Sequence, residues 1–430
     1  MKKNLVLMVM AGVALASCVN DEVEEIVQEP INRKITFESP LAYTNGSRAH
    51  VKGEIANPYP QDETFMIYAT EYEVDNYTGW TGARASDANT VFFNNTEVTF
   101  DTSVDGWAPK KDDQGYYYWT DGNYMAFAAC SPYNLNLSEK NEKPADNAAD
   151  LSTTTYRYYD KDGLTIKNFK VAETSTEQYD LLFSRRLYDQ DAGDMVKVEG
   201  QYSGIQLTFQ HALSSIHFSL LNETLLSTDP KQHETIILKD ISVKNVYTQG
   251  TFKEKITESE TVSEDGESKT VYNMKYDKTE AGNVKPEWSD QSEEANYSAY
   301  KDGDVDLEFP SVQQYVSDYI GKLEKDNPTN KGKYGEAIPL LLLPQDLPEN
   351  ALIEVKYKIK EHTDEDVLTK TIKFHDLKDP NGKKLSEEWK IGTKYTYRLV
   401  YTKETSKKDR IYFAPSTEAW DDGGIIVVNL

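Results

Sequence analysis

The chain has 430 residues and carries 47 Lys and Arg against 72 Asp and Glu, so its formal net charge at pH 7 is −25. This balance argues against nucleic acid as a partner, because no excess of basic residues exists to neutralise phosphates. Apolar residues make up only 38% of the sequence, yet 11% of it is aromatic and 29 residues are Tyr. Disordered acidic chains are poor in aromatic residues, and Tyr is typical of half-buried sheet surfaces. The composition predicts an acidic, folded β protein, long enough for two or three domains.

Residues 1–17 have the pattern of a secretion signal. Two lysines precede a run of apolar and small residues from Leu5 to Ser17, which is shorter than the roughly 20 residues that span a bilayer. The run ends in Leu15-Ala-Ser-Cys18, which resembles a bacterial lipobox. In this interpretation Cys18 becomes the lipidated first residue of the mature chain. The alternative is an ordinary cleaved signal followed by an incidental cysteine.

An acidic stretch follows Cys18 and shows no apolar periodicity, with carboxylates at Asp21, Glu22, Glu24 and Glu25. It resembles the export signal of Bacteroidetes surface lipoproteins, although a solvated tether explains the same residues. Acyl chains on Cys18 would hold the protein on a membrane, since each buried CH₂ contributes about 0.8 kcal/mol. The predicted location is therefore the outer membrane, exposed at the cell surface.

The body of the chain consists of short runs in which apolar and polar residues alternate, separated by Gly, Pro, Asn and Asp. A sustained helical stripe with caps is not found, and at most one turn is expected, near His211–Ser215. Many short strands with turn signals predict an all-β fold of sandwiches or barrels. The clearest runs are Ile35/Phe37, Phe65/Ile67, Val98/Phe100, Ile205/Leu207/Phe209, Ile353/Val355/Tyr357/Ile359 and Tyr395/Tyr397/Leu399/Tyr401.

A polar, Gly-containing stretch at 191–204 is the predicted boundary between two halves. In the second half, residues 254–304 are strongly polar and acidic, and we expect a long surface excursion there. A hairpin around Val271–Met274, held down by Trp288, is the expected structure within it.

Catalytic motifs are missing from the sequence. It contains no Gly-x-Ser-x-Gly, no His-Glu-x-x-His and no glycine-rich phosphate loop. His211 and His217 would share a strand face, but ordinary hydrogen-bonded residues fit that spacing better than metal ligands. The stretch Asp302–Asp306 starts like a calcium loop, yet it lacks Gly at the sixth position and has Gln313 where the bidentate Glu belongs. An enzyme is therefore not expected, and neither a metal nor a cofactor is predicted.

An ordered set of segments resembles the fimbrillin family and covers nearly the whole chain. The most specific is Leu207-Thr-Phe-Gln-His-Ala-Leu-Ser-Ser-Ile216, which is similar to the family's F-x-HALSKI segment but lacks its Lys. The acidic excursion is a second departure, which leaves the subfamily open. The other matching segments, in family order, are Arg48-Ala49, Tyr118-Trp119 with Tyr124–Ala129 and Pro132, Tyr179–Leu182, Ile241 with Val246 and Gly250–Phe252, Leu341–Gln345, and Trp389–Gly392 with Tyr395 and Tyr397.

The resemblance implies a pilin-like subunit, structural or accessory (tip), of a Bacteroidales type V pilus that contributes to adhesion. Its fold would be two transthyretin-like β-sandwich domains with Greek-key character. Such subunits reach the surface as lipoproteins, and an Arg-specific protease then removes the lipid and the first strand. The hydrophobic groove left behind receives a strand from another pilin subunit, so that the mature location is the fimbrium.

The implied organisation begins with a signal peptide at 1–17 and a lipidated tether with the first strand at 18–48, the part that the protease would remove. An N-terminal sandwich at 49–203 and a C-terminal sandwich at 204–430 follow. A donor strand is expected within 411–430.

Arg48 is the predicted cleavage site, with Ala49 as the new N-terminus. It lies in the polar stretch Thr44-Asn-Gly-Ser-Arg48-Ala49, of the kind that proteases enter, just after the predicted strand 34–39. Cleavage would leave 430 − 48 = 382 residues. Arg33 and Arg84 are weaker choices, and an unprocessed protein in which Arg48 is an ordinary loop residue is the alternative.

The C-terminus supplies the predicted donor strand, whose apolar residues follow the glycines at 423–424. It is equally the pattern of a last strand that packs within its own domain, and both interpretations stay open. The residues concerned are Ile425, Ile426, Val427 and Val428.

Two further functions remain open alternatives to the pilin. One is a surface-anchored lipoprotein that binds host or bacterial glycans or proteins, with Trp80, Trp107 or Tyr116–Tyr118 stacking on sugar rings. The other is a pilus anchor that keeps its lipid and receives a strand without donating one.

Overall fold

The computed structural model describes residues 34–426, and within this range it does not describe 39–40, 43–58, 74–89, 112–114, 121–122, 135–154, 161, 185, 192–195, 198–200, 203, 257–258, 265–266, 273–284, 310–313, 361–366, 378–386, 403–410 and 420–424. The described elements all belong to one compact unit that begins at Lys34. The predicted signal, Cys18, Arg48 and Ala49 lie outside the described residues.

The first half of the chain builds one eight-stranded sheet. Its neighbours pair antiparallel except β1 and β12, which run parallel. In sheet order the strands are β1 (Leu41–Ala42), β12 (Thr208–His211), β8 (Leu182–Ser184), β5 (Asn123–Ser131), β2 (Phe65–Glu73), β3 (Thr90–Asp101) and β4 (Gly106–Pro109), with β9 (Leu187–Gln190) against β5.

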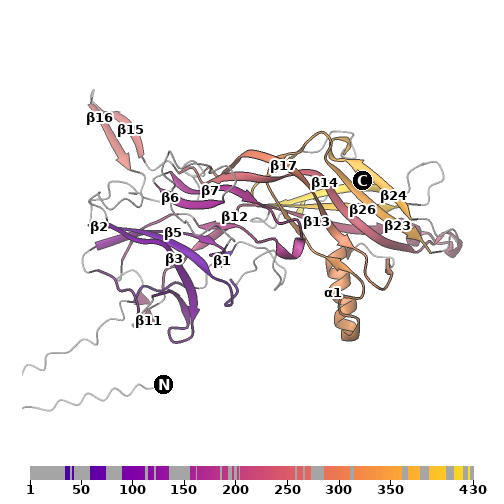
Figure 1. The fold of residues 1–430 in the computed structure, drawn as a ribbon, viewed down its shortest axis with the longest axis horizontal. Helices are drawn as coiled ribbons and strands as arrows, with labels where there is room; N and C mark the ends of the chain where they lie inside the picture. Colours follow the sequence, from indigo (N-terminus) through magenta and orange to yellow (C-terminus); the bar gives the residue numbers. More distant parts are fainter. Residues whose placement is uncertain are drawn as a thin grey trace, which may run out of the picture. The chain divides into compact units, whose positions relative to one another are not determined.

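The second half contributes most of two further sheets, one of eight strands and one of six (Figure 1). One has the order β20 (Glu336–Ala337), β17 (Glu287–Lys301), β14 (Ile236–Lys253), β23 (Leu352–Ile359) and β24 (Leu368–Lys373), with β18 (Leu307–Phe309) and the hairpin β6 (Tyr156–Asp160) and β7 (Gly163–Lys170) attached to β14. The other has the order β19 (Gln314–Tyr315), β13 (Ser214–Asn222), β26 (Thr393–Tyr401), β27 (Ile411–Ala419) and β28 (Ile425–Ile426), with β21 (Leu340–Leu342) on β13.

Three two-stranded pairs complete the strands of the described part. They are β10 (Val196–Lys197) with β11 (Gln201–Tyr202), β15 (Ser259–Glu264) with β16 (Glu267–Tyr272), and β22 (Gln345–Asp346) with β25 (Glu388–Trp389). The predicted all-β class is confirmed, since the described residues form mostly antiparallel sheets, consistent with a two-domain β-sandwich.

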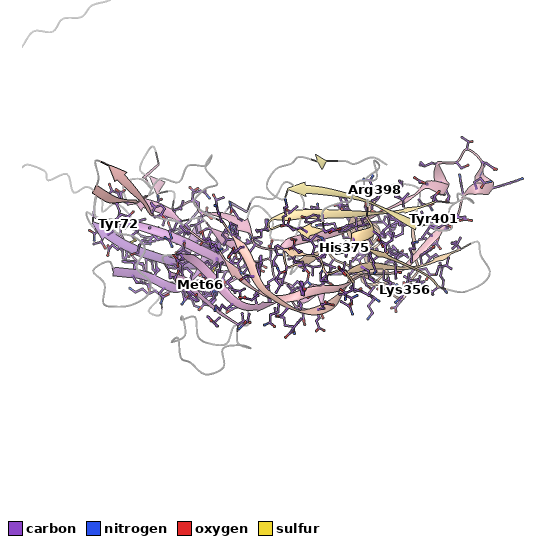
Figure 2. All side chains as sticks on the ribbon, turned by 90° about the horizontal axis from the view of Figure 1, so that it is seen from above. Met66, Tyr72, Lys356, His375, Arg398 and Tyr401 are labelled. Atoms are coloured by element: carbon purple, nitrogen blue, oxygen red, sulfur yellow. The ribbon has the colours of Figure 1, made fainter. Side chains whose placement is uncertain are left out.

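The buried side chains form two hydrophobic clusters that meet at the first sheet. On β2, Phe65 and Ile67 face one cluster, while Met66 and Tyr68 face the other. Figure 2 labels Met66 and Tyr72 on this strand. Because both faces of β2 are covered, its sequence is nearly continuously apolar rather than strictly alternating.

Two elements form hydrogen bonds with strands on the other side of the predicted boundary near residue 203. β12, which follows the boundary, lies in the first sheet next to β8. The β6–β7 hairpin, which precedes it, pairs through β7 with β14 of the second half. The division into 49–203 and 204–430 remains a prediction from the sequence.

The structure corrects the expectation that 254–304 is an excursion throughout. Its last part is β17, which pairs along β14 and buries Tyr297 and Tyr300. The first nine residues of β17 are half-buried or exposed, and four of them are acidic, so the segment has the composition of a loop. A hairpin does occur in this region, but Val271 lies within its second strand, β16, and not at the turn.

A helix also occurs where the sequence indicated none. α1 (Val316–Asp326) buries only Val316 and Ile320 and has no side-chain cap at its start. It therefore lacks the long apolar stripe and the N-terminal cap from which a helix is predicted. The stretch His211–Ser215, where one helical turn was expected, joins β12 to β13 instead. Among the described residues, no helix is both long and apolar enough to cross a membrane.

Buried tyrosines make the fold sensitive to alkaline pH. Burial raises the pKa of Tyr297 to about 12 and that of Tyr395 to about 12. Both rings are almost inaccessible, at 0% and 5% exposed. Since the unfolded phenol loses its proton near pH 10, the unfolded state binds fewer protons than the native state between pH 10 and 12. Stability is then full below pH 10 and falls above it.

We therefore expect the free energy of unfolding to fall by about 1.4 kcal/mol per pH unit for each such tyrosine between pH 10 and 12. Denaturant unfolding at successive pH values measures this slope. Tyr297→Phe should reduce this slope by the contribution of one tyrosine. Thr248→Val removes only the hydroxyl that hydrogen-bonds the Tyr297 hydroxyl and should leave the slope unchanged. An unaltered slope in Tyr297→Phe contradicts the prediction.

Candidate functional site at the N-terminal strand

The first described segment, Lys34–Glu38, which we call the N-terminal strand, lies between two strands of the body. On one side it pairs antiparallel, through bridges from Lys34 to Tyr118 and from Phe37 to Trp107, and on the other Phe37 pairs parallel to Ile205. The chain continues into β1, which extends the parallel pairing onto β12. The segment predicted as the first strand from the Ile35/Phe37 alternation thus makes isolated β-bridges on both sides and is internal to the fold.

Five backbone hydrogen bonds hold the N-terminal strand. The Ile35 N–H donates to the carbonyl of Tyr117 (2.9 Å), and Phe37 exchanges bonds of 2.7 and 3.0 Å with Trp107. On the other side, the Glu38 N–H donates to Ile205 (3.1 Å), whose own N–H donates to the Thr36 carbonyl (2.8 Å). Removal of this segment would leave these neighbouring groups unpaired, and an unsatisfied buried group costs about 1–3 kcal/mol.

The side chains of the N-terminal strand complete the core of the first sheet. Ile35 is 0% and Phe37 1% exposed. The Phe37 ring meets the rings of Phe65 and Phe127 edge-on, with centroids 5.8 Å apart in both cases. Each of the two apolar side chains contributes about 1.5–3 kcal/mol by burial, so this core has an apolar vacancy whenever the segment is absent.

Two glycines flank Phe37 and allow the strands to approach it closely. A Cβ on Gly204 would lie 2.9 Å from the Phe37 carbonyl carbon, and one on Gly106 would lie 3.1 Å from the Phe37 oxygen. Gly204 also has φ +78°, a conformation that side chains with a Cβ rarely adopt. The body thus provides a narrow slot shaped to accept a β-strand.

The entrance of the slot is polar. The Lys34 ammonium lies 3.9 Å from the centroid of the Tyr116 ring, and the Tyr116 hydroxyl donates to Asp101 at 2.7 Å. Hydrogen bonds from Ser103 and Tyr116, with a smaller effect of the Lys34 charge, lower the pKa of Asp101 below its usual range. Asp101 is therefore a carboxylate at neutral pH.

The predicted donor strand lies at the edge of the last sheet. Ile425 and Ile426 form β28, which pairs antiparallel with Glu418 and Thr417 of β27 in the same chain. Val427 and Val428 lie outside the described residues. The backbone of Ile425 and Ile426 is thus paired within its own chain.

The histidines weighed as metal ligands have ordinary hydrogen-bond partners. His211 Nδ1 lies 3.0 Å from Asp180 Oδ1, with both side chains fully buried, and His217 Nε2 lies 2.7 Å from Ser215 Oγ. The described part of the chain contains no cluster of three metal-ligating side chains. Asp302 and Asp306, which resembled a calcium loop, both contact the Lys239 ammonium instead.

The aromatic residues weighed as sugar-stacking groups differ in exposure. Trp107 is 1% exposed within the core and cannot stack on a sugar. Tyr116 and Tyr117 are half-buried, and Tyr118 is 55% exposed. Trp80 lies outside the described residues.

Comparison with known proteins identifies the family of this chain. The model of the Fimbrillin-like family matches residues 69–420, and the chain belongs to this family. The family consists of pilin-like fimbrial proteins of the cell surface rather than enzymes, so the resemblance inferred from the sequence is confirmed. A search of curated proteins found no match.

Among solved structures, similar chains are candidate cell adhesion proteins and a fimbrial protein. One from Bacteroides ovatus is 13% identical, with 90% of this chain and 96% of that chain covered and a TM-score of 0.41. One from Bacteroides uniformis is 12% identical, with 90% and 100% covered and a TM-score of 0.39. The tip fimbrial protein Mfa3 from Porphyromonas gingivalis is 10% identical, with 84% and 95% covered and a TM-score of 0.30. Scores this low carry no conclusion about function.

Phe37 should be the residue on which the first core depends most. We expect Phe37→Ala in the full chain to lower the free energy of unfolding by about 3–5 kcal/mol, because it removes a fully buried ring and leaves a cavity. The matched control is Phe92→Ala, at a half-buried ring on the periphery of the same cluster, where a smaller loss is expected. Denaturant unfolding measures both, and equal losses would contradict the central place given to Phe37.

Proposed function

We propose that the protein is a structural or accessory (tip) subunit of a cell-surface fimbria that is exported as a lipoprotein and assembled by strand exchange. Lipidation at Cys18 holds the precursor on the outer membrane. Cleavage by an Arg-specific protease between Arg48 and Ala49 detaches the N-terminal strand, and a strand of another pilin subunit takes its place. Adhesion follows from the fibre, with a surface glycan or protein as its ligand.

The observation that carries this proposal is the position of the N-terminal strand. It lies between body strands with Ile35 and Phe37 buried, although it is separated from the rest of the body in sequence. The sequence has two cysteines, and Cys130 is a free, buried thiol. A cut at Arg48 would therefore leave the strand held by non-covalent contacts alone.

A slot filled by a new strand is lower in free energy than an empty slot. An incoming strand with apolar residues two positions apart restores both the backbone bonds and the apolar burial, which is the principle of β-augmentation. Because the slot lies near the start of the chain and the predicted donor, Ile425–Val428, lies at its end, donation joins unlike surfaces. Such head-to-tail contacts do not close and so build a filament.

Two alternatives each have one supporting observation. The exposed Tyr118 suits a glycan-binding lipoprotein that stays monomeric. The pairing of β28 with β27 in the same chain suits an anchor subunit that keeps its lipid and accepts a strand without donating.

Limited digestion of the folded precursor with an Arg-specific protease tests the proposal. We expect a new N-terminus at Ala49 and a ladder of oligomers on an unheated denaturing gel, because a fully paired donor strand dissociates slowly. Arg48→Gln should abolish both. The matched control, Arg84→Gln, removes one of the arginines that the sequence offers as a weaker choice and should leave the ladder intact.

Resistance at Arg48 would rule out this residue as the trigger. Cleavage at Arg48 that leaves only monomer, with no added subunit incorporated, would favour the glycan-binding protein. If deletion of residues 425–430 has no effect on assembly and the protein is incorporated only as an acceptor of a strand, the result would favour the anchor subunit.

A further inference from the structure

A second concave site lies away from the slot, at the end of β7. It is a cavity of about 390 Å³, within the range of roughly 300–1,000 Å³ that is usual for small-molecule sites. We call it the β7 pocket. Its apolar lining belongs to one hydrophobic cluster, whereas Ile35 and Phe37 of the slot belong to the other. The β7 pocket is therefore present whether or not the slot is filled by its own strand.

The walls of the β7 pocket come from segments that are distant in sequence and are tied together by one amide. The Gln178 side chain, which is 2% exposed, donates to the Ala172 carbonyl at 3.1 Å. Its oxygen accepts from the Leu341 N–H at 2.8 Å. The amide thus joins the segment after the 3₁₀ turn Ser175–Glu177 to the end of β7 and to β21. Walls fixed in this way before a ligand arrives reduce the entropy that is lost on binding.

The floor of the β7 pocket is apolar. Phe169 is 7% exposed, and Val171, Leu213 and Leu341 are buried around it. The Phe169 ring is held from behind by Trp288, with centroids 5.6 Å apart. A ligand that enters the pocket therefore meets a dry and fixed base.

The rim of the β7 pocket is polar and carries one accessible aromatic ring. Tyr179 and Thr155 are half-buried there, and Glu177 and Lys170 are exposed. The Thr155 hydroxyl donates to the Asn168 carbonyl at 2.7 Å, so its oxygen is left to accept from a ligand. The Glu177 carboxylate is a second acceptor, and the Lys170 ammonium is a donor.

An apolar base, an aromatic ring and a polar rim together fit a sugar. A pyranose ring presents a face of C–H groups, which packs against an aromatic ring, and an edge of hydroxyls, which both donate and accept. A wholly apolar ligand would bury the polar rim without partners, which is unfavourable. The volume suits one or two sugar units rather than a folded partner.

The charges around the β7 pocket favour a neutral sugar over an acidic one. Lys170 donates to Glu293 at 2.8 Å, and this hydrogen bond, with a smaller effect of Glu173, raises the pKa of Lys170. One ammonium is thus set against the carboxylates of Glu173, Glu177 and Glu293. A sugar that carries a carboxylate would meet net repulsion there.

We propose that the β7 pocket binds a neutral saccharide of one or two units. Tyr179 stacks on the sugar ring, and Glu177 and Thr155 accept hydrogen bonds from its hydroxyls. This inference rests on the adhesive role in the proposed function and supplies the site and the class of ligand. Because the pocket shares no residue with the slot, binding requires neither cleavage nor strand exchange.

Saturation-transfer NMR on the full-length, uncleaved protein tests the inference. The probes are the methyl glycosides of glucose, galactose, mannose, fucose, N-acetylglucosamine and N-acetylgalactosamine, with N-acetylneuraminic acid as the acidic sugar. We expect at least one neutral glycoside to bind with an affinity that salt hardly changes, and N-acetylneuraminic acid to bind more weakly. Failure of every neutral glycoside to bind, or a preference for the acidic sugar, would overturn the inference.

Substitutions then place the bound glycoside in the β7 pocket. Glu177→Gln should lower its affinity by roughly 10-fold, because a hydrogen bond to a charged group is lost. The matched control is Glu173→Gln, the same change at an exposed residue of the same segment that does not line the pocket, and it should leave the affinity unchanged. Tyr179→Leu should weaken binding by roughly 3- to 10-fold, whereas Tyr179→Phe keeps the ring and should bind.

Thermal unfolding shows whether each variant is folded. If Tyr179→Leu does not fold, Glu177→Gln decides the outcome, since its side chain is exposed. A glycoside that binds Glu177→Gln as tightly as the unaltered protein occupies another place, and the β7 pocket is then overturned as the site.

The outcomes separate this inference from the proposed assembly. If no glycoside binds but cleavage at Arg48 still gives a ladder of oligomers, assembly stands and the β7 pocket is overturned. If a glycoside binds and Glu177→Gln weakens it but no ladder forms, the pocket stands and assembly by strand exchange fails.

Discussion

The first sheet of this protein depends on one strand that is inserted between segments far from it in sequence. Phe37 contacts Trp107 through backbone bonds on one side and lies beside Ile205 on the other, and its ring packs against Phe65 and Phe127. The core of this sheet is therefore complete only when the slot is occupied. Nothing in these contacts requires the occupant to be covalently joined to the body, because hydrogen bonds and apolar burial depend on pattern and position alone.

The body around the slot is held by contacts that do not involve the N-terminal strand. On the opposite face of the first sheet, Tyr68 stacks on Tyr159 of β6, with centroids 5.0 Å apart, and the buried Arg157 donates to the carbonyls of Pro132 and Tyr133. Gln178 accepts a hydrogen bond from the Leu341 N–H at 2.8 Å. A scaffold anchored on its far face can keep the slot's geometry while the strand is exchanged, which is the preorganisation that fast and specific rebinding needs.

Apolar and polar groups contribute unequally to the slot. The apolar positions supply most of the free energy, since burial of Ile and Phe side chains is worth several kcal/mol in total, but many strands carry two apolar residues two positions apart. The polar entrance contributes less, because it is partly solvated and screened by salt.

The sequence alone determined the all-β class, the family and the position of the buried N-terminal segment. These follow from local patterns: the period-2 alternation of Ile35 and Phe37, and the segment around His211 whose order of residues resembles the family. A strand with a polar outer face shows its alternation directly. The absence of catalytic motifs is likewise visible in sequence, because such motifs depend on fixed local spacing.

Tertiary structure decided what the sequence pattern left out. The first residues of β17 are acidic and none of them is fully buried, so it is the pairing with β14 that defines this part as a strand. α1 buries two residues and has no cap, so nothing local distinguishes it. The ammonium of Lys34 lies over the Tyr116 ring, whose hydroxyl donates to Asp101, and these residues approach one another through long-range strand pairing. Local sequence patterns indicate which face of a helix or strand is buried. The neighbour of a strand in a sheet is determined by contacts between distant parts of the chain.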